Sequence, residues 1–172
     1  MKKLIAYLQP RRHLALAVAF VSASVLVVAL IAQYGFDLKP CELCILERWP
    51  YAANIVLGLL AFGATFRYPR LVPLLLSLVA TSFFINTVIA GYHVGVEQKW
   101  WEGPSACTGS FLSPNMSIAQ LRELLTHKAV VRCDVAAWRL FGISMAGYDC
   151  ITAFILGILT AYLLKKDHAT QA

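Results

Sequence analysis

The chain has 172 residues, of which 59% are hydrophobic, and it carries a formal net charge of +6. Its mean hydropathy is +0.67, and a soluble domain of this length cannot hide so much apolar surface in one core. A membrane-spanning helix takes about 20 apolar residues, so the chain has room for about four spans and one further segment. The composition excludes an ordinary soluble domain and predicts a single integral-membrane domain over residues 1–172.

The charges are distributed unevenly along the chain. Eight of the 15 Lys and Arg residues lie in short segments between or beyond the apolar runs, where Asp167 is the only acidic residue. The net charge of these segments is therefore +7, and the net charge of the rest of the chain is −1. The eight are Lys2, Lys3, Arg11, Arg12, Arg67, Arg70, Lys165 and Lys166. This asymmetry follows the positive-inside rule, which sets orientation in the membrane. It predicts cytoplasmic termini and argues against a nucleic-acid partner.

The first two apolar runs predict two helices. Residues 14–32 form a run of 19 residues without a charge, longer than the roughly 7–15 apolar residues of a cleaved signal peptide. We therefore expect an uncleaved first span. The second span is expected at 46–66, and the sequence from Arg67 to Arg70 is a short cytoplasmic turn.

Two further spans complete the expected bundle. The third covers residues 71–92 and contains no charge. The fourth has only 15 uncharged residues, Cys150 to Leu164. Extending it to 146–164 places Asp149 near the interface, where its carboxylate is expected to reach water.

The two segments that join these spans on the other side are expected to face outward, away from the cytoplasm. They are the short loop 33–45 and the long loop 93–145. In the long loop, Ser117-Ile-Ala-Gln120 matches a capping box and predicts a short helix to about residue 127. Residues 135–144 mix apolar side chains with one arginine, which indicates a segment on the membrane surface or a packed helix.

The cysteine pattern carries most of the chemical information. Of the five cysteines, Cys41 and Cys44 form a C-x-x-C motif directly before the second span. Zinc sites use close pairs of ligands, and because no second short pair follows, we expect no metal site. A structural disulfide is also a poor explanation, since C-x-x-C closes a very small ring. The motif favours a redox pair, because a helix N-terminus lowers the pKa of a thiol.

Arg48 is a candidate partner of this motif. If the helix begins near Pro40, Cys44 and Arg48 lie one turn apart on the same face. The guanidinium would favour the Cys44 thiolate and could donate to a carbonyl oxygen of a lipid-soluble acceptor. The alternative is an ordinary arginine that reaches the interface from a helix end.

The remaining cysteines lie later in the chain. Cys107 and Cys133 occupy a loop that contains Gly103 and Pro104 and can bring them together. Their pairing stays open, because four cysteines allow three connectivities. Cys150 is expected to be a buried, unpaired thiol.

Several of these features together resemble one family. They are the run Pro40-Cys41-x-x-Cys44-x-x-Glu47-Arg48, the two later loop cysteines, the four spans, the stretch Tyr92-His93-Val-Gly-Val-Glu97-Gln98, and the stretch Trp138-Arg-Leu-Phe-Gly-Ile-Ser-Met145. In spacing, topology and loop position the chain resembles the bacterial DsbB disulfide-bond formation proteins. The resemblance implies an all-α four-helix bundle in the inner membrane, with a site for ubiquinone, or alternatively menaquinone, at its periplasmic end.

The resemblance also implies roles for single residues. Cys107 and Cys133 would form the disulfide that a reduced periplasmic DsbA-type partner attacks. Cys133 would then attack the Cys41–Cys44 bond and release Cys44, which would pass electrons to the quinone beside Arg48. His93 is implied as a quinone neighbour, with an interfacial histidine as the alternative.

Two other functions compete with a quinone-dependent protein-dithiol oxidase. A vitamin-K-epoxide-reductase-like enzyme also joins a C-x-x-C to a quinone, but it would place the loop cysteines before that motif. A non-catalytic membrane module stiffened by disulfides is the third hypothesis. Asn54 and Asn86, polar groups within the spans, could be cited for that third hypothesis, but we expect them to bridge helices.

Overall fold

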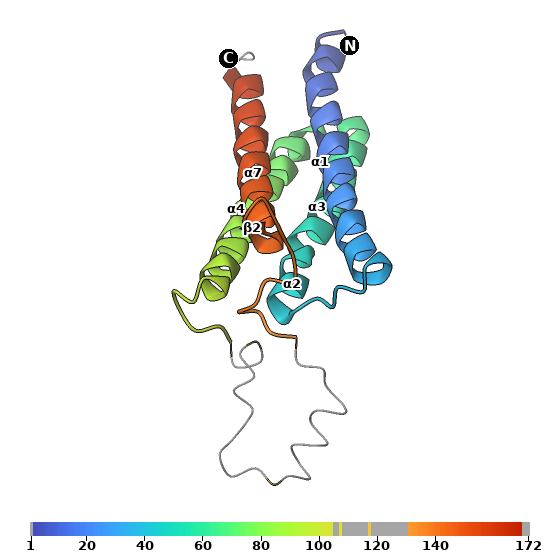
Figure 1. Cartoon of the computed structure of the whole chain (residues 1–172). Helices are drawn as coiled ribbons and strands as arrows, with labels where there is room; N and C mark the ends of the chain where they lie inside the picture. Colours follow the sequence, from blue (N-terminus) through green and yellow to red (C-terminus); the bar gives the residue numbers. More distant parts are fainter. Residues whose placement is uncertain (1, 105–106, 108–116, 118–130, 170–172) are drawn as a thin grey trace.

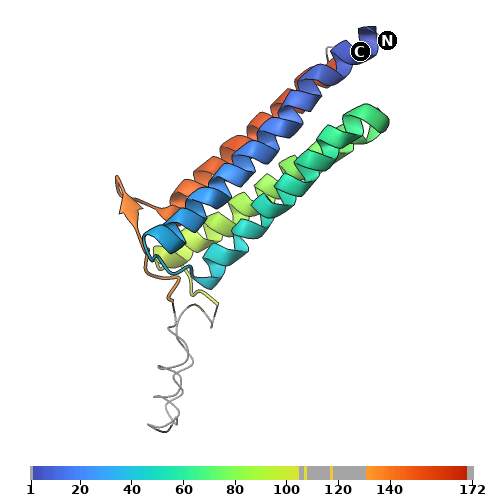
Figure 2. The same ribbon diagram turned by 90° about the vertical axis from the view of Figure 1, so that its right-hand side faces the viewer.

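Four long helices run side by side in a computed structural model that describes residues 2–104, 107, 117 and 131–169 (Figures 1 and 2). The elements are α1 (Lys2–Gly35), α2 (Glu42–Leu46), α3 (Arg48–Arg67), the 3-10 turn η1 (Pro69–Leu71), α4 (Val72–Glu97), β1 (Arg139–Leu140), β2 (Ile143–Ser144) and α7 (Met145–Ala169). By length and composition, four stretches can cross a membrane, namely Arg11–Gly35, Glu42–Arg67, Pro69–Glu97 and Met145–Asp167. The expected all-α, four-helix membrane protein is confirmed.

The helices extend beyond the apolar runs that predicted them. The first spanning stretch begins at Arg11 rather than residue 14, and the third ends at Glu97 rather than residue 92. Charged side chains near a helix end can reach the interface, so they do not stop the helix where the apolar run stops. This lengthening places Glu97 on α4, inside the region that sequence analysis assigned to a loop.

The bundle has two different ends. The termini and η1 lie at one end, and the segments 36–47 and 131–144 lie at the other, called the thiol end below (Figure 2). The outer surface of the helices is apolar: Phe20 on α1 and Val88 on α4 are 75% and 72% exposed. Such a surface is stable in lipid but not in water.

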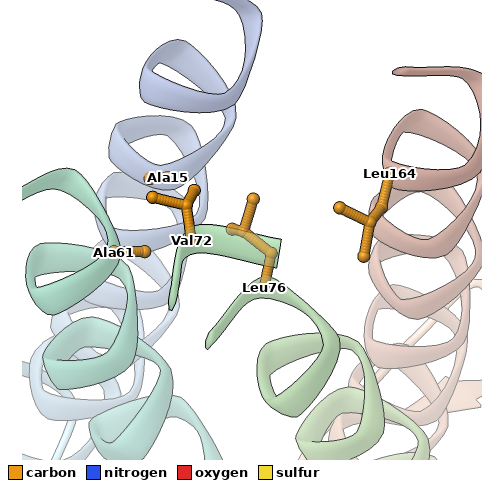
Figure 3. Close-up of a cluster of buried hydrophobic side chains, with 5 residues drawn as sticks. All are labelled: Ala15, Ala61, Val72, Leu76 and Leu164. Carbon is orange, nitrogen blue, oxygen red and sulfur yellow. The ribbon is translucent and has the colours of Figure 1, made fainter. Parts of the chain in front are cut away.

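The helices pack in the order α1, α3, α4, α7. Near the terminal end, small and branched side chains from all four helices form a buried cluster, made of Ala15, Ala61, Val72, Leu76 and Leu164 (Figure 3). By contrast, α1 and α7 touch each other little. The described residues include one ion pair between them, from Arg11 to Asp167 at the terminal end.

The segment before α7 differs from the prediction. Residues 139–144 form a two-stranded antiparallel hairpin in which Arg139 pairs with Ser144 and Leu140 with Ile143. The alternative of a packed helix was therefore wrong, whereas the expectation of a segment on the membrane surface stays a prediction. Phe141 and Gly142 both have positive φ, 50° and 81°, which is the backbone of a tight hairpin turn. The helix expected from residue 117 to 127 lies outside the described residues.

The contact between α1 and α3 requires a glycine. A Cβ on Gly58 would lie 2.9 Å from the carbonyl oxygen of Ala15 and 3.1 Å from the Cβ of Ala19. Small residues let membrane helices approach closely, and dispersion and weak polar contacts then hold them together. The identity of residue 58 thus controls the distance between these helices.

We therefore expect Gly58→Leu to destabilise the bundle by about 1–3 kcal/mol, the usual cost of overpacking. Gly63→Leu on the same helix is the matched control, because a Cβ there meets nothing within 4 Å. Both variants would be unfolded in detergent and followed by circular dichroism. Equal losses of stability in the two variants would contradict the close contact between α1 and α3.

Candidate functional site

The C-x-x-C motif forms the first turn of a short helix. Cys41 is the N-cap of α2, and its sulfur accepts a hydrogen bond from the backbone N–H of Cys44 at 3.1 Å. Cys41 is buried, Cys44 is half-buried, and both are free thiols. The prediction of a C-x-x-C at a helix start is confirmed. The helix is shorter than expected, however, because α2 ends at Leu46 and α3 begins at Arg48.

His93 faces this motif from α4. Its Nε2 lies 3.6 Å from the sulfur of Cys41, and its Nδ1 lies 2.7 Å from Oε1 of Glu47. The Oε1 atom of Glu97, one helical turn along α4, lies 4.0 Å from the same Nε2. Sequence analysis implied His93 as a neighbour of the quinone, whereas the structure places it directly against a thiol. Glu47 was expected to be a solvated or paired charge, and it is paired with His93. No role was predicted for Glu97, although the spacing of His93 and Glu97 matches one turn of helix.

The two loop cysteines form a disulfide. Cys107 and Cys133 are bonded, with their Cα atoms 5.0 Å apart, and the backbone N–H of Cys133 donates to the carbonyl of Cys107 at 3.1 Å. The pair is buried in one cluster with Cys41, Leu43 and Val96. The structure thereby selects one of the three connectivities and brings both cysteine pairs into the same cluster.

Cys150 lies apart from these pairs. Its sulfur is 3.6 Å from the carbonyl oxygen of Thr87, between α7 and α4, and it is a free thiol that is half-buried. This matches the expected unpaired thiol, although the side chain is not fully buried.

A large cavity begins at the thiols and extends between α1 and α7. Its volume is about 830 Å³, the size of cavity that holds a small organic molecule. The walls are mostly apolar and come from α1, residues 39–51, α4, the segment before α7 and the start of α7. The lining includes Val21, Val25, Val28, Ala29, Cys41, Cys44, Glu47, Arg48, Tyr51, His93, Glu97, Ala146, Asp149 and Thr152.

Arg48 lines this cavity together with Cys44. Its Nη1 donates to Oε1 of Gln33, at the end of α1, at 2.7 Å. The predicted placement of Cys44 and Arg48 beside one another is supported by their shared cavity. The contact to Gln33 was not expected.

Asp149 lies on the opposite wall. The Tyr51 hydroxyl donates to Oδ1 at 2.6 Å, and Asn86 Nδ2 donates to Oδ2 at 3.0 Å. The expectation that this carboxylate reaches water near the interface stays a prediction, and the two hydrogen bonds from α3 and α4 were not expected. Asn86 therefore bridges helices as predicted, whereas the amide of Asn54 has no hydrogen-bond partner among the described side chains.

The electrostatics of the motif favour a reactive Cys41. The side chain of Cys44 donates a hydrogen bond that lowers the pKa of the Cys41 thiol, and the backbone N–H of Cys44 lowers that pKa further. Burial of Cys41 raises the pKa but does not outweigh these hydrogen bonds, so the pKa lies below its usual value. Because the thiolate is the nucleophile, Cys41 in the reduced motif is a better nucleophile near neutral pH than an ordinary thiol.

We expect Cys44→Ala to raise the pKa of Cys41, because alanine removes the side-chain donor, and Cys44→Ser to retain much of the effect through its hydroxyl. Alkylation of Cys41 in the reduced protein slows as the pH decreases below the pKa of its thiol. This decline should begin at a higher pH in the alanine variant than in the serine variant. Short iodoacetamide pulses across a pH series, with mass spectrometry of the peptide that contains Cys41, would measure this. Identical pH profiles of the two variants would show that the side-chain hydrogen bond from residue 44 does not lower the pKa of Cys41.

Comparison with known proteins agrees with this geometry. Residues 11–163 match the family model "Disulfide bond formation protein DsbB". The chain is 32% identical over 150 residues to "Disulfide bond formation protein B" of Xylella fastidiosa strain Temecula1, covering 82% of this chain and 84% of the relative. It is 25% identical over 167 residues to the protein of the same name from Azoarcus sp. strain BH72, covering 94% and 96%. It is also 26% identical over 163 residues to "Uncharacterized protein RP370" of Rickettsia prowazekii, covering 93% and 92%.

No solved structure gives a significant match to the chain. The family match covers the first three spans, the cysteine-bearing segments and most of the fourth span. Family membership supports a disulfide-forming oxidoreductase and a multi-pass protein of the inner membrane. The chain belongs to the DsbB family of disulfide bond formation proteins.

Proposed function

We propose that the protein is a quinone-dependent protein-dithiol oxidase, which reoxidises a periplasmic DsbA-type thiol oxidoreductase and passes the electrons to membrane quinone. One observation carries this proposal: two cysteine pairs share a buried cluster at the head of an apolar cavity. The positive charges at the terminal end support cytoplasmic termini, which would leave the thiol end in the periplasm.

The order of thiol exchange follows from the two pairs. A thiolate of the reduced partner attacks the Cys107–Cys133 disulfide, and Cys133 leaves as a thiolate. Cys133 then attacks the oxidised Cys41–Cys44 pair at Cys41, and Cys44 is released as a thiolate. Each exchange breaks one S–S bond and forms another. The second thiol of the partner then attacks the mixed disulfide with Cys107 and closes the partner's own disulfide, and the Cys107 thiolate that is released attacks Cys133, re-forms the Cys107–Cys133 bond and releases Cys41. Two electrons have then moved from the partner to the Cys41–Cys44 pair, which is left reduced. The shared cluster of Cys41 and Cys133 supports the attack of Cys133 on Cys41.

His93 and Glu47 would manage the proton at Cys41. The imidazole Nε2 is near enough to accept the thiol proton, and the Glu47 carboxylate would stabilise the imidazolium that forms. This arrangement follows the general logic of an activated thiol, in which a base lies beside the nucleophile and a third group orients the base. We therefore assign His93 a role in thiol activation, in addition to its place on the cavity wall.

The cavity suits a quinone in size and polarity. Its mostly apolar walls match an isoprenoid tail, and the Arg48 guanidinium would provide N–H donors for a quinone oxygen. When bound, the quinone would supply a two-electron acceptor. The residues of the cavity would hold it near Cys44, exclude water from the thiolates and provide acid–base groups. The weak contact between α1 and α7 supports entry from the lipid.

Cys44→Ser is expected to abolish quinone reduction driven by a dithiol partner, because no sulfur remains to receive the electrons from Cys41. Cys150→Ser is the control and should retain the wild-type rate, since Cys150 is outside both pairs. Quinone absorbance would be followed in detergent with a reduced DsbA-type protein as donor. Wild-type turnover by the Cys44 variant would refute the proposed function.

Arg48→Met is expected to raise the KM for quinone by about 10- to 100-fold, the equivalent of one hydrogen bond to a charged group. Arg67→Met, at the far end of the same helix, is the matched control and should leave the KM unchanged. Steady-state rates at a series of quinone concentrations would separate KM from kcat. If both variants raise the KM equally, Arg48 affects the stability of the protein and does not bind the quinone.

A further inference from the structure

Four side chains with metal-binding atoms converge at the thiol end. The sulfurs of Cys41 and Cys44 and a ring nitrogen of His93 all lie within 4.8 Å of one another. Glu97 adds a carboxylate oxygen 4.0 Å from His93 Nε2. Sequence analysis argued against a metal because no second close pair follows the C-x-x-C. The fold supplies the missing ligands from α4, about fifty residues later in the chain.

The separation of these atoms fits zinc. Zinc binds sulfur at about 2.3 Å and imidazole nitrogen at about 2.0–2.1 Å in a tetrahedral site, which places the sulfur and the nitrogen about 3.6 Å apart. The distance from Cys41 Sγ to His93 Nε2 is 3.6 Å. The corresponding nitrogen–oxygen separation is about 3.4 Å, whereas Glu97 Oε1 lies 4.0 Å from Nε2. Glu97 would therefore have to rotate toward the other three ligands when the ion binds.

Glu97 provides an independent reason to expect a cation. The residue is 8% exposed, and its Oε2 has no hydrogen-bond partner in the part of the chain that the structure describes. A buried carboxylate oxygen without a donor is costly. A metal ion between Glu97 and the thiols would satisfy that oxygen.

Glu47 completes the arrangement. Metal-binding histidines commonly donate the N–H of the other ring nitrogen to a carboxylate, which fixes the tautomer and the ring orientation. Here the Nδ1 of His93 lies 2.7 Å from Glu47 Oε1. This contact leaves the lone pair of Nε2 directed toward Cys41.

We propose that the reduced protein binds Zn²⁺ through Cys41, Cys44, His93 and Glu97, and that the bound ion keeps the C-x-x-C from being oxidised. Binding converts two thiols to thiolates and releases two protons, and no electron moves. A Cys41–Cys44 disulfide removes both sulfur ligands, so zinc and the disulfide exclude one another. The site goes beyond the proposed function and makes that function sensitive to zinc.

The test uses the full-length protein in detergent with Cys107, Cys133 and Cys150 replaced by serine, so that only the two thiols of the motif remain. Zinc affinity would be measured by competition with a chromophoric chelator, with the motif reduced or oxidised. The reduced form should bind one Zn²⁺ per chain, at least about 100-fold more tightly than the oxidised form, since thiolates are the main ligands. Similar affinity in the two forms would overturn the proposal.

Variants of the acidic residues test the assignment of ligands. Glu97→Gln should weaken zinc binding by at least about 10-fold, and Glu47→Gln by about 10- to 100-fold, as is usual for groups that orient a metal-binding histidine. Glu102→Gln, at an exposed glutamate in the following segment, is the matched control and should have no effect. If the Glu97 and Glu102 variants bind zinc equally, Glu97 is not a ligand and the four-ligand site is refuted.

Co²⁺ provides a measurement that does not depend on replacing Glu97 or Glu47. Bound to the reduced protein, it should give the intense visible bands of a tetrahedral ion and a sulfur charge-transfer band of two thiolates. A weak octahedral spectrum would overturn the site even where a variant fails to fold. Neither experiment contains quinone or a partner protein, so their outcome is independent of whether the proposed oxidase activity is correct.

Discussion

The buried contact between Glu47 and His93 organises the thiol end of the molecule. Glu47 lies at the junction of α2 and α3, and His93 lies on α4, so their 2.7 Å contact joins two helices that are distant in sequence. A buried imidazole and a buried carboxylate are each costly alone, and pairing them removes most of that cost. Because the ring is fixed on one side, its other nitrogen faces Cys41, and the position of the reactive pair follows from that constraint.

The helices of the bundle pack closely at the terminal end and leave a cavity toward the thiol end. At the terminal end, small side chains and the Arg11–Asp167 ion pair hold the helices together. Toward the thiol end, α1 and α7 separate and the cavity occupies the space between them. Polar groups such as Arg48 and Asp149 also line this cavity, and hydrogen bonds to Gln33, Tyr51 and Asn86 satisfy them. An apolar molecule could therefore lie along the walls with its polar group near the thiols.

The sequence was sufficient for features that depend on local patterns. Apolar runs and the charge asymmetry predicted the four helices, and the C-x-x-C before an apolar run predicted thiols at a helix start. It was insufficient where a residue finds its partner through the fold: Glu47 and His93 are 46 positions apart, and Tyr51 and Asp149 are 98 apart. The hairpin at 139–144 was missed because its apolar residues dominated the prediction, although Phe141-Gly142 is a recognisable turn.

One lone pair is shared by the two chemistries proposed for this site. The Nε2 of His93 can accept a proton from Cys41 or coordinate a metal ion, but it cannot do both at once. The carboxylate of Glu47 assists either role, because it stabilises a protonated imidazole and also increases the basicity of a coordinated one. Both roles require the reduced motif, because a Cys41–Cys44 disulfide has neither a proton to give nor a thiolate to bind a metal ion. Zinc would thus compete with the proton for Nε2 in the reduced state, and oxidation of the motif would remove both competitors at once.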